Sequence, residues 1–171
     1  MSSQHSPLNG QRIIIGISGG IACYKTADLV SALVQMGVLV DVVMTEPATR
    51  FVTPLTFESL TGRPVFDSQW KHIDGNEPQH IKIASTADAM LIAPCTMDML
   101  ARLALGLTDD PVSLVCSAIE RKKTPVLLAP SMNVAMFNQP STQRNLQLVD
   151  DDGFKILCPG EGWQACRGKL V

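Results

Sequence analysis

The sequence of 171 residues predicts one α/β domain with a doubly wound, mainly parallel sheet in three layers. Short apolar runs rich in β-branched residues recur along the chain, and most are followed by a segment with apolar residues at helical spacing. The first unit is a strand, a glycine-rich turn, a helix and a second strand. This order implies a right-handed crossover between parallel strands. The length suits a single domain with a substantial core.

The expected strands and helices alternate along the chain. We expect strands at 12–17, 38–44, 87–93, 124–129 and 154–157. We expect helices at 21–36, 99–107, 111–121 and 139–150, with a weaker helical pattern between 51 and 64. Gly37 suits the end of the first helix, Pro111 the first turn of the third, and Asp98 the N-cap of the second.

The remaining segments are expected to lie outside this core. Residues 1–10 are expected to form a disordered or loosely ordered extension, followed by a single domain at 11–171. The polar, turn-rich residues 67–78 are expected to form a surface loop. His80 follows in a segment that is expected to lead directly into the strand at 87–93.

Composition excludes several classes of function. The net charge is −2, and no cluster of basic residues marks a surface for nucleic acid or anionic membranes. No apolar run approaches the roughly 20 residues of a membrane span. The polar N-terminus lacks the basic start and apolar core of a signal peptide. We therefore expect a cytoplasmic protein without a nucleic-acid or membrane partner.

The number and spacing of the cysteines indicate a reducing compartment. Their number, five, is odd, and neither a Cys-x-x-Cys pair nor a Cys/His set suggests a metal site. Four of them are expected to pack as small apolar residues: Cys23, Cys95, Cys116 and Cys158. Cys166 stands in a glycine-bearing loop, which is a poor place for a core thiol and leaves a reactive role open.

Four loops follow the carboxyl ends of expected strands, at 18–20, 44–46, 93–98 and 130–136. In a doubly wound sheet such loops meet at one edge, where ligands bind. Ser18-Gly19-Gly20 suits either an anion, most often a phosphate, or simply tight packing. The loop matches neither the dinucleotide fingerprint nor a Walker loop, so a mononucleotide is favoured over NAD or ATP.

The loop at 130–136 places an amide, Asn133, between the thioethers of Met132 and Met136. The residues alone leave two interpretations open. In one, the methionines fill a gap in the core and Asn133 caps a helix. In the other, the loop lines a ligand pocket at the end of its strand.

The combination of motifs resembles the homo-oligomeric flavin-containing cysteine decarboxylases. The shared features are Ser18-Gly-Gly-Ile-Ala22, His80, Pro130-x-Met-Asn-x-x-Met136 and Ala165-Cys166. The resemblance covers about residues 11–166, and the Pro-x-Met-Asn-x-x-Met motif is its specific part. It implies a Rossmann-like or flavodoxin-like fold, FMN as cofactor, and a homotrimer or multiple of trimers with FMN at a subunit interface. It also implies 4′-phosphopantothenoylcysteine of coenzyme A biosynthesis as the substrate.

The same resemblance implies roles for individual residues. The implied FMN contacts are Gly19, Gly20, Ile21, Thr45, Thr96, Asp98, Met99 and Ser131. The implied substrate contacts are Asn133, Met136 and Ala165. The implied catalytic residues are His80 as base or proton relay, Asn133 as holder of the substrate carboxylate, and Cys166 as proton donor on a flap at 158–171.

The implied chemistry suits these residue types. In the family, FMN oxidises the thiol-bearing carbon to a thioaldehyde, which accepts electrons as CO₂ leaves, and the reduced flavin then returns a hydride. A histidine with an ordinary pKa near 6.5 suits proton transfer. The Asn133 amide donates hydrogen bonds to a carboxylate without the strong ground-state stabilisation of a Lys or Arg.

Three departures from the family pattern and several alternatives accompany this interpretation. Phe137 stands where the family usually has Trp, Asp98-Met99 replaces Asn-Thr, and Arg167 rather than glycine follows Cys166. The motif does not exclude a peptidyl-cysteine decarboxylase. A non-catalytic FMN-binding regulatory subunit and a plain mononucleotide-binding module are further alternatives. A flavin prenyltransferase is disfavoured because it gives no role to His80 or Cys166.

Overall fold

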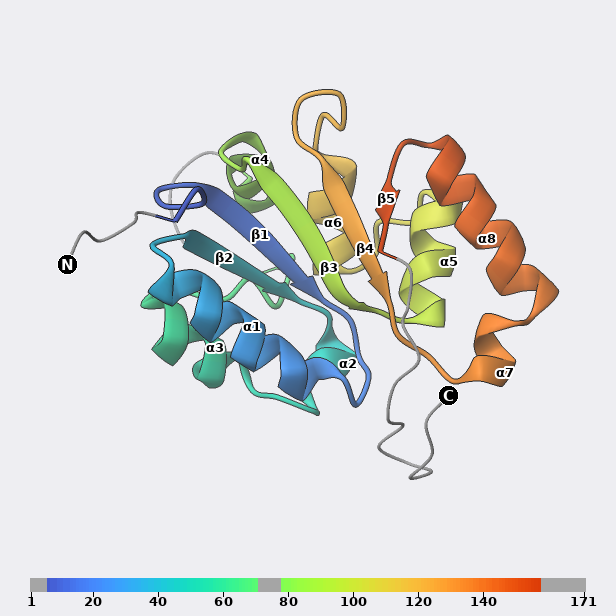
Figure 1. The fold of residues 1–171 in the computed structure, drawn as a ribbon, viewed down its shortest axis with the longest axis horizontal. Helices are drawn as coiled ribbons and strands as arrows, with labels where there is room; N and C mark the ends of the chain where they lie inside the picture. Colours follow the sequence, from blue (N-terminus) through green and yellow to red (C-terminus); the bar gives the residue numbers. More distant parts are fainter. Residues whose placement is uncertain (1–5, 71–77, 158–171) are drawn as a thin grey trace.

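The computed structural model describes residues 6–70 and 78–157 of the chain. Its five-stranded sheet has the order β2-β1-β3-β4-β5, and every neighbouring pair is parallel (Figure 1). The strands are β1 (Arg12–Ile17), β2 (Leu39–Met44), β3 (Ala89–Cys95), β4 (Val126–Pro130) and β5 (Lys155–Ile156). This is the flavodoxin-like strand order, whose direction reverses between β1 and β3. The predicted fold class is therefore confirmed.

Helices cover both faces of this sheet and its β5 side. They are α1 (Cys23–Gln35), α2 (Glu46–Thr49), α3 (Pro54–Thr61), α4 (Gln79–Ser85), α5 (Met97–Leu105), α6 (Pro111–Ser117), α7 (Val134–Phe137) and α8 (Pro140–Asp151). α1 and α3 pack beside each other over β1 and β2, and α4 and α6 pack against the opposite face. α5 and α8 pack together beside β4 and β5 (Figure 1).

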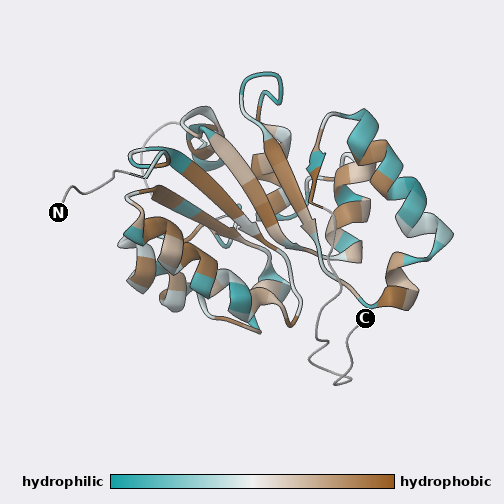
Figure 2. Cartoon of the chain, viewed as in Figure 1, coloured by the Kyte–Doolittle hydropathy of each residue, from teal (hydrophilic) through white to brown (hydrophobic). Residues whose placement is uncertain are grey.

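The core consists of two apolar clusters on the two faces of the sheet. Ile14 and Ile15 are consecutive in β1 and fully buried, and they belong to different clusters because successive side chains of a strand point to opposite faces. A strand buried on both faces must be apolar throughout, which explains the continuous runs in the sequence. Figure 2 shows the central strands largely hydrophobic and α8 hydrophilic along much of its length.

Two local predictions were wrong. The segment that begins at His80 does not run directly into a strand; it forms α4. Its alternating sequence is ambiguous over so short a stretch, and the helix buries Ile83 and Ala84 against the core. Thr96, not Asp98, is the N-cap of α5, so this helix begins two residues earlier than expected.

Other local predictions were confirmed. Gly37 follows the end of α1 with a φ of 84°, in the left-handed region that favours glycine. Asp110 caps α6, and Pro111 occupies the first turn of that helix.

Gly10 donates its N–H to the Gly37 carbonyl at 2.9 Å, so the residues just before β1 lie against the α1–β2 turn. In the part of the chain that the structure describes, no helix is long and apolar enough to cross a membrane.

A partly buried ion pair joins the first two strands. The Asp41 side chain on β2 is 11% exposed, and its two carboxylate oxygens accept from the Arg12 Nε at 2.5 Å and the Arg63 Nε at 2.8 Å. A buried carboxylate must be paired and hydrogen-bonded, and here two guanidinium groups do so. This triad connects β1, β2 and the segment that follows α3.

We expect Asp41→Ala to lower the free energy of unfolding by about 2–3 kcal/mol, because it leaves two guanidinium groups without their carboxylate. Urea unfolding of the apoprotein measures this loss. Glu46→Ala is the matched control, because it breaks the exposed Glu46–Arg50 pair, which is worth less than about 1 kcal/mol. Equal losses in the two variants would contradict a stabilising role for the triad.

Three of the four cysteines that were expected to pack are part of the core: Cys23, Cys95 and Cys116. The fourth, Cys158, lies outside the described residues. Burial raises the pKa of all three thiols, that of Cys116 to about 12. The thiolate is the reactive form of cysteine, and it is scarce at neutral pH for each of these groups.

We expect these three thiols to resist iodoacetamide in the native protein at pH 8, because they are buried and protonated. Peptide mass mapping after native labelling checks this. The same residues in guanidinium-unfolded protein provide the control and should label fully. Labelling of any of the three in the native protein at the rate seen after unfolding would contradict the assignment.

Candidate functional site

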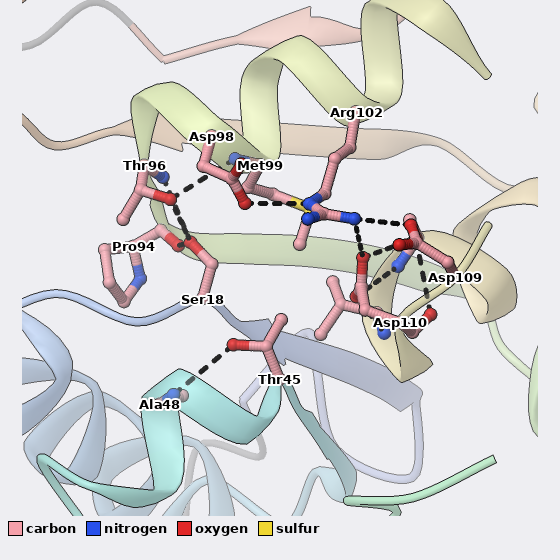
Figure 3. A network of polar contacts seen from close by, with 12 residues as sticks. Ser18, Thr45, Ala48, Pro94, Thr96, Asp98, Met99, Arg102, Asp109 and Asp110 are labelled. Atoms are coloured by element: carbon pink, nitrogen blue, oxygen red, sulfur yellow. Dashed lines mark hydrogen bonds and ion pairs between the residues drawn. The ribbon is translucent and has the colours of Figure 1, made fainter. Parts of the chain in front are cut away.

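The structure brings the four predicted loops together at the carboxyl edge of the sheet. Thr45, after β2, donates its N–H to the Ile17 carbonyl of β1 at 3.0 Å. Ser131, after β4, donates its N–H to the Cys95 carbonyl of β3 at 3.0 Å. The loops after β1 and β3 are joined directly through Ser18 (Figure 3). The candidate site therefore lies where the strand order reverses, which is the ligand position in this class of fold.

The two glycines after β1 permit this close approach. A Cβ atom on Gly19 would lie 2.5 Å from the Cβ of Pro47 at the start of α2. A Cβ atom on Gly20 would lie 3.2 Å from the Cγ2 of Thr96. Any side chain at Gly19 must therefore push the β1–α1 loop away from α2. The tight-packing interpretation of this glycine pair is correct for Gly19.

The same loop also suits an anion. Within the described residues, the backbone N–H groups of Gly19 and Ile21 donate no hydrogen bond, whereas the Gly20 N–H is directed at the Cys23 thiol. They precede the N-terminus of α1, a helix of 13 residues whose dipole favours negative charge at that end. A phosphate group fits such a cradle because it accepts several N–H bonds at once. The two interpretations of the glycine loop are compatible.

Three of the polar site residues are helix caps. The Thr45 hydroxyl accepts from the Ala48 N–H of α2, and the Thr96 hydroxyl accepts from the Met99 N–H of α5, each at 3.3 Å. The Asn133 Oδ1 accepts from the Ala135 N–H of α7 at 2.8 Å. Short helices thus begin one residue after β2 and β3 and three residues after β4, with their N-terminal ends at the same edge. The capping interpretation of Asn133 is confirmed.

Ser18 was not among the predicted site residues. Its side chain is buried, and it donates to the Pro94 carbonyl at 2.6 Å and accepts the Thr96 N–H at 3.0 Å. The hydroxyl also lies 3.1 Å from the Thr96 Oγ1. Its partners are 76 and 78 residues away in the sequence, so no local pattern signals the contact.

An arginine balances the acidic residues of the α5–α6 region (Figure 3). The Arg102 Nε donates to the Asp98 carboxylate at 2.7 Å, and its Nη1 bonds Asp109. These bonds raise the pKa of Arg102 and lower the pKa of Asp109. The i,i+4 spacing of Asp98 and Arg102 is the sequence signal for this pair. The acidic residue in the predicted cofactor loop thus has a cationic partner in its own helix.

The segment after β4 carries both exposed and half-buried groups. Ser131, Met132 and Asn133 are half-buried, whereas Val134 and Met136 are exposed. The Thr142 hydroxyl donates to the Met136 carbonyl at 2.7 Å and fixes α7 on α8. Met99 differs from these residues because its side chain is fully buried, which leaves only its backbone for a contact at this edge.

His80 does not join this group within one chain. Helix α4, which carries it, lies near the amino end of the sheet, where β1 and β3 begin (Figure 1). Its neighbour Gln79 lines a hollow together with Arg12, the first residue of β1. The two predicted residues of the flap, Ala165 and Cys166, lie outside the described residues.

The chain is similar in sequence and in structure to known proteins. The chain is 43% identical over 159 residues to the coenzyme A biosynthesis bifunctional protein CoaBC of Vibrio cholerae, covering 93% of this chain and 39% of that protein. The crystal structure of the FMN-dependent cysteine decarboxylase SpaF matches with a TM-score of 0.83 and 29% identity, covering 95% of this chain and 90% of that one.

A second solved structure is a cysteine-to-serine mutant of PPC decarboxylase complexed with pantothenoylaminoethenethiol. It matches with a TM-score of 0.80 and 28% identity and covers 94% of this chain and 87% of that one. The chain spans about two fifths of the length of the bifunctional relatives. The family model named Flavoprotein matches residues 1–170. With the flavodoxin-like strand order and the shared loop edge, this match shows that the chain belongs to the flavoprotein family.

Proposed function

We propose that this chain binds FMN at the carboxyl edge of its sheet and decarboxylates the cysteinyl carboxylate of 4′-phosphopantothenoylcysteine. The observation that carries the proposal is the placement of the Asn133 segment, directly after β4, at the same edge as the glycine loop after β1. The relatives add to this: CoaBC is named for coenzyme A biosynthesis, and the matched PPC decarboxylase was crystallised with pantothenoylaminoethenethiol.

The residues at this edge fit FMN. The N–H groups of Gly19, Gly20 and Ile21 would hold its phosphate. Four others would line the rest of the cofactor: Thr45, Thr96, Asp98 and Ser131, with Met99 contributing its backbone. Bound FMN would supply the two-electron oxidation and later reduction of the substrate, chemistry that no side chain can perform alone.

Asn133 is the proposed holder of the substrate carboxylate, with Met136 beside it. Capping fixes the orientation of the Asn133 side chain, because its Oδ1 is committed to the Ala135 N–H. An amide then offers N–H donors to a carboxylate without adding a full positive charge. A weaker hold on the reactant carboxylate keeps the barrier to CO₂ loss low.

Helix α4, which carries His80, lies near the amino end of the sheet, whereas Asn133 follows β4 at the carboxyl edge. We therefore propose that the working site forms between copies in a homotrimer or a multiple of trimers. His80 of a neighbouring copy would act as base or proton relay at the edge that holds Asn133. Six large apolar side chains of the described residues are at least half-exposed, and burial by another copy would suit four of them: Ile21, Tyr24, Phe51 and Leu55. Cys166 on the proposed flap at 158–171, with Ala165 beside it, would return the final proton.

A peptide ending in cysteine is the second candidate substrate. The likeness to SpaF, an FMN-dependent cysteine decarboxylase, favours keeping this candidate. The reaction would again remove a C-terminal cysteinyl carboxylate. We place either activity in the cytoplasm, where free thiols such as Cys23, Cys95 and Cys116 persist.

We expect purified protein to be yellow, to show a flavin absorption band, and to convert 4′-phosphopantothenoylcysteine into 4′-phosphopantetheine with release of CO₂. Mass spectrometry of the product measures the conversion. A peptide ending in cysteine, assayed in parallel, separates the two substrate classes. Colourless protein that cannot be reconstituted with FMN would refute the proposal, and yellow protein inactive on both substrates would refute the decarboxylation.

We expect His80→Asn and Asn133→Asp each to lower the decarboxylation rate by at least about 100-fold, the range typical of losing a positioned proton-transfer or binding group. Aspartate keeps the cap on α7, so the loss in Asn133→Asp reflects the carboxylate pocket rather than the helix. Mixed oligomers of the two variants, formed by co-expression, should regain activity, because one intact site arises where the copies alternate. Mixtures that stay inactive would contradict a site shared between copies.

A further inference from the structure

We propose that Ser18 is a positioning residue that sets the spacing between the two halves of the cofactor site. One half is the loop of Gly19, Gly20 and Ile21 after β1, and the other is the turn of Thr96–Met99 after β3. The inference rests on the FMN binding proposed above. It does not depend on which molecule is decarboxylated.

The Ser18 hydroxyl is buried and bonded within the chain rather than turned toward a ligand. The residue is 2% exposed, and its single O–H is directed to the Pro94 carbonyl at 2.6 Å, with the Thr96 Oγ1 at 3.1 Å. One of its acceptor sites takes the Thr96 N–H at 3.0 Å. Its backbone also donates to the Pro94 carbonyl at 3.3 Å. All these partners belong to the segment after or at the end of β3, so the side chain acts on that segment (Figure 3).

The end of β3 needs such a partner. Pairing between β3 and β4 is irregular between Ile92 and Cys95. Buried backbone groups that leave a strand ladder must find other partners. The Ala93 carbonyl accepts from the Thr26 hydroxyl at 2.9 Å, and the Pro94 carbonyl accepts from Ser18. Two hydroxyl side chains of one chain segment thus hold two successive carbonyls of β3.

Only one of these two hydroxyls also reaches the ligand edge. Thr26 lies within α1 and ends at the Ala93 carbonyl. The Ser18 hydroxyl also accepts a hydrogen bond from the N–H of Thr96, the residue that caps α5. The start of α5 is therefore fixed relative to the glycine loop that leads into α1. Since the N-termini of both helices face this edge with their positive dipole ends, their separation decides how well one anionic cofactor meets both.

The pair Ser18→Ala and Thr26→Val separates positioning from stability. Each substitution deletes one buried hydroxyl that bonds a β3 carbonyl, so both should lower the melting temperature of the apoprotein. We expect Ser18→Ala to raise the FMN dissociation constant by at least about tenfold and Thr26→Val to change it less than about twofold. Titration of apoprotein into FMN, followed by quenching of flavin fluorescence, measures the constants, and differential scanning fluorimetry measures the melting temperatures.

Ser18→Cys gives a second variant, with a side chain of similar shape and a weak S–H donor, should Ser18→Ala fail to fold. We expect the FMN dissociation constant of Ser18→Cys to exceed that of the wild type. The FMN dissociation constant of Thr26→Val should again stay near the wild-type value. Equal effects of the Ser18 and Thr26 variants on FMN binding, or wild-type binding by the Ser18 variant that folds, would overturn the inference. Wild-type protein that binds FMN but decarboxylates nothing would refute only the proposed reaction and leave this result standing.

Discussion

The parallel pairing of β1 with β3 is the constraint on which the rest of the structure depends. Because the strand order reverses there, the connections after β1 and β3 leave the sheet in different directions, and the carboxyl edge between them is the ligand position of this class of fold. Both strands are buried on two faces, so they must be apolar and their backbone groups must be paired. Where the ladder of β3 becomes irregular, Ser18 and Thr26 replace strand neighbours as partners.

The caps at this edge stabilise helices and lie in the proposed FMN site. Thr45, Thr96 and Asn133 each end the extended backbone of a strand and satisfy the first N–H groups of a short helix. The same geometry turns helix N-termini toward the site, where negative charge is favoured. Helices that begin soon after parallel strands need small polar N-cap residues, and these side chains therefore lie around any anion bound at this edge. In the proposed FMN site, the caps that stabilise these helices are therefore also the residues that line the cofactor.

Local signals were sufficient for most of the fold and insufficient for the contacts that cross it. Continuous β-branched runs predicted β1 to β4, and Gly37 and Pro111 predicted helix ends, because each signal acts within a few residues. Helix α4 was missed because His-Ile-Lys-Ile alternates like a strand, and Thr96 was missed as a cap because Asp98 is an equally good candidate. The role of Ser18 depends on Pro94 and Thr96, which only the folded chain brings near.

The position of His80 extends this argument from one chain to an assembly. The sequence motifs that resemble one site are divided by the fold: Asn133 and the glycine loop lie at the carboxyl edge, and α4 lies near the amino end. A proton-transfer group must reach hydrogen-bond distance of the reacting atoms. The proposed site therefore takes its two residues, His80 and Asn133, from different copies of the chain. Catalysis by these residues would then require assembly, and apolar side chains left exposed on the single chain would have a reason to be there.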